Sequence, residues 1–211
     1  MAHIPDGVLA APVLIGGALI SAGLLAISLR RLDYERIPQA AVLSAGFFVC
    51  SLITVPVGPS SVHLLLNGLM GVVLGWASVP AILVALVLQA AFFGYGGLLV
   101  LGVNTLNMAL PALVCAALFA PRLAAGSCRR PFLLGALGGG VGVVLTGLMV
   151  SLVIAMSRDA FLPAAKVILL TYLPLAVVES VVTGAVIAFV WRVAPELLQT
   201  RFDGQPAHQH G

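Results

Sequence analysis

Long apolar runs follow one another along almost the whole chain, and few charged residues interrupt them. Of the 211 residues, 61% are hydrophobic and only 8% are charged, whereas soluble domains typically carry about 25% charged residues. A chain with so few charges cannot cover a surface that faces water on all sides. The pattern predicts an all-α integral membrane protein.

Seven stretches are candidates for membrane-spanning helices, which need about 20 mainly apolar residues. The third is short and rich in glycine, so a re-entrant element is an alternative for it. Residues 1–194 are interpreted as one transmembrane domain, and residues 195–211 as a cytoplasmic C-terminal tail. The seven stretches are Val8–Leu29, Ala40–Val57, Ser61–Gly75, Val79–Phe93, Leu98–Ala120, Pro131–Met156 and Ala164–Val193.

The positive charges indicate an orientation in the membrane. If the N-terminus lies outside and the chain crosses the membrane seven times, only Arg158 and Lys166 among the basic residues lie outside. This bias favours an outer N-terminus and a cytoplasmic C-terminus in a multi-pass membrane protein. The net charge of +3 reads as loop charge, and no basic stripe interleaved with aromatics indicates a nucleic-acid partner. The arginines placed inside are Arg30, Arg31, Arg36, Arg122, Arg129, Arg130, Arg192 and Arg201.

Three other features exclude common alternatives. No Lys or Arg precedes the first apolar run, and that run exceeds the roughly 7–15 residues of a signal-peptide core, so we expect it to be retained. Cys50, Cys115 and Cys128 lack CxxC spacing, so neither a disulfide framework nor a zinc site is expected. The glycines of the sixth span favour close helix packing, because the wider pattern of a dinucleotide-binding loop is missing.

Polar side chains within the predicted spans gather towards the outer face, and such residues are functional candidates. His63 and Asn67 are four positions apart, so on a helix they would share a face and Asn67 would orient the His63 ring. The alternative for each amide or hydroxyl is a bridge between helices. Glu179, deep in the last span, either links helices that move or is only hydrogen-bonded. The polar set is Ser60, Ser61, His63, Asn67, Gln89, Asn104, Thr105 and Asn107.

The chain opens with "MAHIPDG", which has the chemistry of a metal chelate. A free amine, ionised backbone amides and an imidazole close small rings around one cation and suit Ni²⁺ or Cu²⁺. If Met1 is retained, its amine, the amides of Ala2 and His3 and the His3 ring supply four nitrogens. If Met1 is removed, Ala2 supplies the amine, and His63 is the candidate for the missing ligand. The alternative is an ordinary turn with Asp6 as the N-cap of the first helix.

Three segments, "HIPDGVL", "SSVHLLLNGLMGVVLGW" and "VLQAAFFGYGGLLVLGVNTLNMALPAL", resemble the CbiM/NikM family. These proteins are the substrate-capturing membrane subunits of energy-coupling-factor cobalt and nickel importers. The resemblance covers roughly residues 3–193 and implies seven helices, with the N-terminus inserted into the outer part of the bundle. It also implies that the first residue's amine, the next residue's amide and imidazole, and a distant histidine bind the ion. Here the two histidines are His3 and His63, and Ala2 is inserted into the usual Met-His start.

The resemblance further implies Ni²⁺ or Co²⁺ as transported substrate and several partners. No GxxxxGK[ST] phosphate loop is present, so ATP hydrolysis would fall to ATP-binding-cassette ATPase subunits, joined by a transmembrane coupling subunit and a small accessory membrane subunit. His208 and His210 are interpreted as part of a solvated tail. The residues expected around the metal ligands are Asp6, Ser61, Asn67, Gln89, Asn104 and Asn107.

Two other functions stay open at this stage. One is an intramembrane enzyme that uses Ser60 or Ser61 with His63, although neither a GxSxG elbow nor an HExxH helix is present. The other is a passive metal channel. Uptake without an ATPase partner would favour the channel, and a hydrolytic activity that depends on either serine would favour the enzyme.

Overall fold

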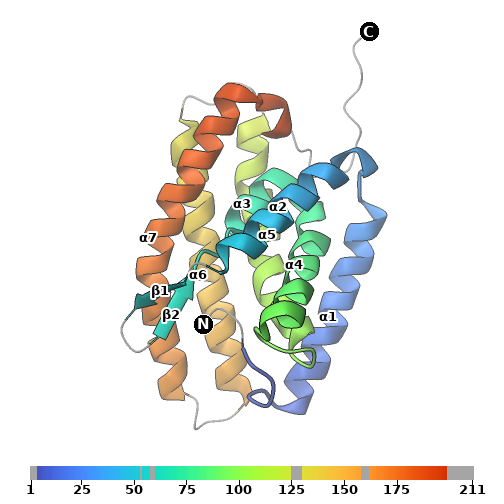
Figure 1. The fold of residues 1–211 in the computed structure, drawn as a ribbon, viewed down its shortest axis with the longest axis vertical. Coiled ribbons are helices and arrows are strands. Elements are labelled where there is room, and N and C mark those ends of the chain that lie inside the picture. The colour runs from blue at the N-terminus through green and yellow to red at the C-terminus, as the bar shows by residue number, and fades with distance from the viewer. Residues whose placement is uncertain (1–3, 53, 58–59, 125–129, 158–161, 199–211) are drawn as a thin grey trace.

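The computed structural model describes residues 4–52, 54–57, 60–124, 130–157 and 162–198. Within these residues, seven α-helices and one two-stranded hairpin follow in chain order (Figure 1). In the view of Figure 1, α1 and α7 lie on opposite sides of the bundle, and α3 and α5 lie between them. The elements are α1 (Ala11–Arg30), η1 (Tyr34–Arg36), α2 (Ile37–Cys50), β1 (Thr54–Val57), β2 (Ser60–His63), α3 (Asn67–Leu74), η2 (Gly75–Ala77), α4 (Ser78–Phe93), α5 (Leu101–Ala124), α6 (Pro131–Ser157), α7 (Leu162–Val193) and η4 (Pro195–Leu198).

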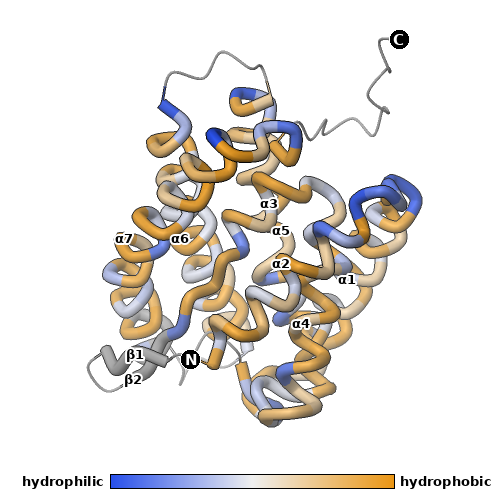
Figure 2. The backbone as a smooth tube through the Cα atoms, turned by 45° about the horizontal axis from the view of Figure 1, so that its top comes forward, coloured by the Kyte–Doolittle hydropathy of each residue, from blue (hydrophilic) through white to orange (hydrophobic). Residues whose placement is uncertain are grey.

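Five helical stretches in the described part of the chain are long and apolar enough to cross a membrane. Hydrophobic residues follow one another along the helices, and hydrophilic residues gather where α1 leads into α2 (Figure 2). This agrees with the predicted class of helical membrane protein. The seven-span count and the outward N-terminus stay predictions. The five stretches are α1, Asn67–Phe93, α5, α6 and Val167–Val193.

The structure corrects the second and third predicted spans. Helix α2 ends at Cys50, and the residues that follow form a hairpin in which Thr54 pairs with His63 and Val57 pairs with Ser60. The strand Thr54–Val57 reads Thr-Val-Pro-Val, and β-branched residues favour an extended backbone. The helix predicted from Ser61 starts only at Asn67 and has eight residues.

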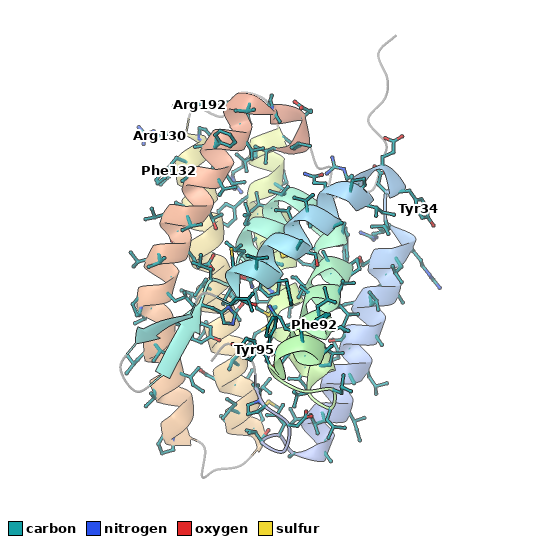
Figure 3. All side chains as sticks on the ribbon, viewed as in Figure 1. Tyr34, Phe92, Tyr95, Arg130, Phe132 and Arg192 are labelled. Carbon is teal, nitrogen blue, oxygen red and sulfur yellow. The ribbon has the colours of Figure 1, made fainter. Side chains whose placement is uncertain are left out.

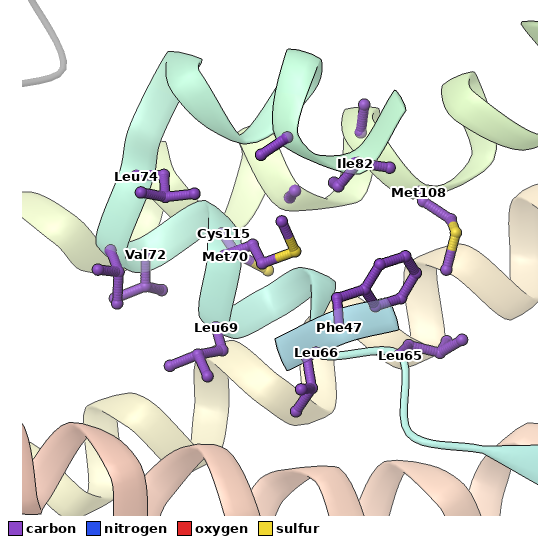
Figure 4. Close-up of a cluster of buried hydrophobic side chains, with 14 of the residues drawn as sticks. Phe47, Leu65, Leu66, Leu69, Met70, Val72, Leu74, Ile82, Met108 and Cys115 are labelled. Carbon is purple, nitrogen blue, oxygen red and sulfur yellow. The ribbon is translucent and has the colours of Figure 1, made fainter. Parts of the chain in front are cut away.

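Helix α3 is the centre of the core, and all its residues are buried. It can lie there because two of its residues are glycines. A Cβ atom on Gly68 would overlap the carbonyl of Gly138 in α6, and one on Gly71 would overlap the carbonyl of Ala112 in α5. Figure 4 shows the surrounding apolar cluster, which Phe47 of α2 also joins.

Helices α6 and α7 also approach closely through glycine. A Cβ atom on Gly139 would lie 2.6 Å from the carbonyl oxygen of Glu179, and one on Gly135 would lie 2.7 Å from Cβ of Ile187. Only glycine allows backbones to pack at this distance. The close packing predicted from the glycines of the sixth span is confirmed.

The labelled side chains of Figure 3 mark the two halves of the bundle. Arg130 and Arg192 lie at one end, while Phe92 and Tyr95 lie in the opposite half (Figure 3). The described N-terminal segment that precedes α1 also lies in the half away from these arginines (Figure 1). The N-terminal segment and the two basic residues are therefore separated along the helix axes.

Candidate metal centre

The segment that precedes α1 is held inside the bundle by one side chain of α5. The amide of Asn104 donates from Nδ2 to the carbonyl of Ile4 at 3.1 Å, and its Oδ1 accepts from the Ile4 N–H at 3.2 Å. Asn104 is 4% exposed and Ile4 is 3% exposed. Since both main-chain polar groups of Ile4 are paired with one planar amide, this residue is fixed in position and direction. We call this arrangement the Ile4 clamp.

Apolar contacts and a carboxylate support the clamp. The side chains of Ile4 and Leu9 are buried in one cluster with Val100, Val103, Val150 and Ile154, from α6, α5 and the residue before α5. Oδ1 of Asp6 accepts from the backbone N–H of Val100 at 3.1 Å, and a Cβ atom on Gly97 would overlap this carboxylate. The segment is thus seated against the start of α5.

The alternative that Asp6 caps the first helix is wrong. The N-cap of α1 is Ala10, which makes no side-chain capping bond, and Pro12 lies in the first turn of the helix. The Asp6 carboxylate instead bonds the backbone just ahead of α5, where the N-terminal end of the helix dipole favours a negative charge. The turn therefore joins two helices that are distant in sequence.

His63 is the last residue of β2 and is only 5% exposed. Its Nδ1 lies 2.9 Å from the carbonyl oxygen of Leu64. A carbonyl only accepts, so Nδ1 carries the proton and the lone pair of Nε2 is the one a cation can bind. Burial lowers the pKa of the His63 imidazole below its usual range.

The backbone after His63 takes an unusual course before α3 begins. Leu66 has a φ of 47°, and it is the one non-glycine residue with positive φ in the described ranges. A left-handed leucine costs about 1–2 kcal/mol, so other contacts must stabilise it. Glu179 of α7 supplies them, because its Oε1 accepts from the backbone N–H groups of both Leu65 and Leu66, at 2.9 Å for Leu66.

Asn67 does not orient the His63 ring as predicted. His63 belongs to a strand and Asn67 is the first residue of α3, so the two do not share a helix face. The Nδ2 group of Asn67 donates to the carbonyl of Met108 at 3.2 Å and to the hydroxyl of Thr146 at 2.8 Å. Asn67 therefore ties α3 to α5 and α6.

The remaining predicted residues fall into three groups. Gln89 and Asn107 are 0% and 1% exposed, and their amide atoms have no hydrogen-bond partner among the described residues. Ser60 and Ser61 belong to β2, and the description covers their backbone alone. Met1, Ala2 and His3 lie outside the described residues, as do His208 and His210. Within the described residues, no group of three His, Cys, Asp or Glu side chains is close enough to hold a metal ion.

Sequence reasoning missed the partner of Glu179 and the partner of Asp6. Both acids bond backbone N–H groups far away in the chain, at Leu65, Leu66 and Val100. A backbone N–H carries no residue identity, so no pattern in the sequence marks it. The sequence indicates only that Glu179, an ionisable residue inside a predicted span, needs some partner.

The helical bundle of this chain is similar to two solved structures described as metal transporters. One crystal structure, described as a transition metal transporter, aligns with a TM-score of 0.79 and 26% identity over 90% of this chain and 93% of that chain. A second, of a truncated transition metal transporter, gives a TM-score of 0.77 and 25% identity over 90% of this chain and 98% of that chain. This chain therefore shares the fold of two solved proteins that are described as transition metal transporters.

The chain belongs to the CbiM family, because the model of the cobalt uptake substrate-specific transmembrane region matches residues 3–197. A Haemophilus influenzae protein named for metal transport is 40% identical over 93% of this chain and 96% of that protein. The fused nickel transport protein NikMN of Rhodobacter capsulatus is 33% identical over 94% of this chain, which spans 64% of that relative. The cobalt transport protein CbiM of Geobacter sulfurreducens is 28% identical over 93% of this chain and 61% of that protein.

Proposed function

We propose that this protein is the substrate-capturing membrane subunit of an energy-coupling-factor importer for Ni²⁺ or Co²⁺. The cation is held by nitrogens of the first residues, by His3 and by His63. The observation that carries the proposal is the Ile4 clamp, since residue 4 directly follows His3 and is buried at 3% exposure. A chain fixed at this point delivers the preceding nitrogens to the interior of the bundle.

The chemistry of these donors fits the cargo. If Met1 is removed, the ligands are the Ala2 amine, the amide and ring of His3, and Nε2 of His63. If Met1 is retained, its amine, the amides of Ala2 and His3 and the His3 ring form the set. Nitrogen donors select against Mg²⁺ and Ca²⁺, which prefer oxygen. They do not reject Cu²⁺, which binds such sites more tightly, so the supply of metal contributes to selectivity.

The surroundings of the ligands have supporting roles in this proposal. Asn104 and Asp6 hold the N-terminal segment through Ile4 and Val100. Gln89 and Asn107 offer buried amide groups that can bond the ligand-bearing residues. The predicted role of Ser61 beside the ligands belongs to the same proposal, whereas Asn67 ties α3 to α5 and α6.

The topology and partners complete the proposal. Seven spans with an outer N-terminus place the cation site on the outer side of the inner membrane and the arginine-rich end in the cytoplasm. Arg130 and Arg192 at the same end of the bundle support this orientation (Figure 3). Uphill uptake uses ATPase subunits and a transmembrane coupling subunit. The fused nickel transport relatives named NikMN and LarMN support an additional membrane partner. Membership of a metal-transport family argues against an enzyme.

The test is metal analysis of the purified protein combined with mass spectrometry of its intact N-terminus. We expect bound nickel or cobalt in the wild type, and none in His3→Ala or in a protein whose N-terminal amine is acetylated. His63→Ala is expected to lose the metal when mass spectrometry shows that Met1 is removed, because His63 is then the fourth ligand. Thr105→Val is the matched control, because Thr105 is buried in α5 and its hydroxyl, within the part of the chain that the structure describes, donates to the Leu101 carbonyl of its own helix. Equal loading of acetylated and free protein would overturn the proposal.

A further inference from the structure

Glu179 is a buried carboxylate that the ligand set does not use. It lies in α7, is 0% exposed, and its Oε1 accepts hydrogen bonds from the N–H groups of Leu65 and Leu66. These residues are 114 and 113 positions away in the sequence. Two hydrogen bonds from consecutive backbone N–H groups converge on one oxygen, so this contact fixes the segment between β2 and α3.

One peptide group links Glu179 to His63. The carbonyl of Leu64 accepts from Nδ1 of His63 at 2.9 Å, and the N–H of Leu65 donates to Glu179. That carbonyl and that N–H belong to the same peptide unit. The unit is planar and trans, because the structure has no cis peptide bond in its described residues, so its C=O and N–H point in opposite directions. Glu179 therefore holds the N–H of this peptide unit, and the C=O of the same unit orients the imidazole of His63.

Packing makes this segment rigid around the same plane. The side chains of Leu65 and Leu66 are 0% and 8% exposed and belong to the core cluster (Figure 4). Leu66 keeps its left-handed backbone with its N–H bonded to Glu179 at 2.9 Å. Without the carboxylate, two buried N–H groups lose this acceptor, and the segment is expected to rotate to regain partners.

We infer that Glu179 is a positioning residue for the cation site, which it serves by holding the Leu64–Leu65 peptide plane that orients His63. This inference rests on the proposed role of His63 as a metal ligand. It also assigns α7 a part in cation binding, since the strength of the site depends on where α7 lies. A shift of α7 away from β2 releases the imidazole and lowers the affinity for the cation.

The experiment compares three variants of the full-length protein by Ni²⁺ titration and by visible absorption of the bound ion. Glu179→Ala removes the acceptor, and we expect Ni²⁺ affinity about 10–100-fold below wild type with an altered absorption spectrum. Glu179→Gln keeps an Oε1 that can accept both N–H groups, so we expect the wild-type spectrum and affinity within about tenfold of wild type. Thr183→Val is the control on the same helix. Thr183 is buried and valine has nearly the same shape, so we expect the wild-type Ni²⁺ affinity and absorption spectrum.

Wild-type affinity and spectrum in Glu179→Ala would overturn the inference. Equal weakening of the Ala and Gln variants with an unchanged spectrum would also overturn it, because the carboxylate would then act by charge alone. If Glu179→Ala does not fold, amide hydrogen exchange of Leu65 and Leu66 replaces it: protection in wild type and in Glu179→Gln supports the inference, and fast exchange in wild type overturns it. If wild type itself binds no Ni²⁺, or if His63→Ala binds it normally, the proposed function fails instead.

Discussion

Replacing Asn104 with alanine removes the clamp that holds Ile4. The native amide makes two buried hydrogen bonds to the main chain of Ile4, at 3.2 and 3.1 Å. Each such bond contributes a net free energy of about 0.5–1.5 kcal/mol. The loss of both weakens docking of the N-terminal segment by about 1–3 kcal/mol, which corresponds to a factor of roughly 5–150 in the docking equilibrium.

The assay is isothermal titration of detergent-solubilised protein with Ni²⁺. We expect the apparent affinity of Asn104→Ala to fall within that range, because the ligands before Ile4 are no longer held at the site. Asn104→Leu, which keeps the volume of the side chain, is expected to fall by a similar factor, which separates the lost bonds from a packing defect. The control is Thr105→Val, since the Thr105 hydroxyl donates to the Leu101 carbonyl of its own helix.

The reasoning is refuted if both Asn104 variants bind Ni²⁺ with wild-type affinity while His63→Ala does not bind. In that case the N-terminal ligands reach the ion without the clamp. The Thr105→Val control substitutes the neighbouring residue in the same turn of α5. If it binds Ni²⁺ normally, a general loss of stability in this turn does not explain weak binding by the two Asn104 variants.

Three further predictions concern packing and the cation. Gly97→Ala introduces a Cβ atom that overlaps the Asp6 carboxylate at a φ of 151°, so we expect several-fold weaker Ni²⁺ binding, measured by titration; unchanged affinity would contradict the role of this contact. Gly139→Ala places a Cβ 2.6 Å from a backbone oxygen of α7, and such overpacking costs about 1–3 kcal/mol; the thermal midpoint should fall, whereas Gly23→Ala, with nothing within 4 Å, should leave it unchanged or higher. Ni²⁺ at about one hundred times its dissociation constant stabilises the folded state by about 2.7 kcal/mol, and the resulting rise in thermal midpoint should be absent in His63→Ala.

Much of the helical architecture could be predicted because apolar run length is a strong signal in membrane proteins. The run predicted as 131–156 is observed as Pro131–Ser157, and the run predicted as 79–93 is observed as Ser78–Phe93. The hairpin at Thr54–His63 could not be predicted, because a short apolar run does not distinguish a strand from part of a helix. Two predicted spans were therefore drawn through it.

The candidate site was predictable only where a side chain carries the chemistry. His63 stands out in the sequence as a histidine beside apolar residues, and the structure shows it buried. The groups that hold it are main-chain atoms of Leu64 and Leu65, which any residue supplies. The same holds for Asn104, whose partner is the main chain of Ile4 rather than its side chain. These hydrogen bonds between side chains and main-chain atoms depend on the fold, so the composition of the sequence and the spacing of its residues do not predict them.

The clamp at Ile4 recognises main-chain atoms, and this has a consequence for how the protein can vary. Substitution of residue 4 by another apolar side chain leaves both bonds to Asn104 intact. In the proposed site, a residue inserted between His3 and Ile4 would move the preceding ligands by up to about 3.3–3.6 Å, which exceeds the tolerance of a metal–nitrogen bond. In the proposed site, the direct adjacency of His3 and Ile4 is therefore under stricter constraint than the identity of the side chain at position 4.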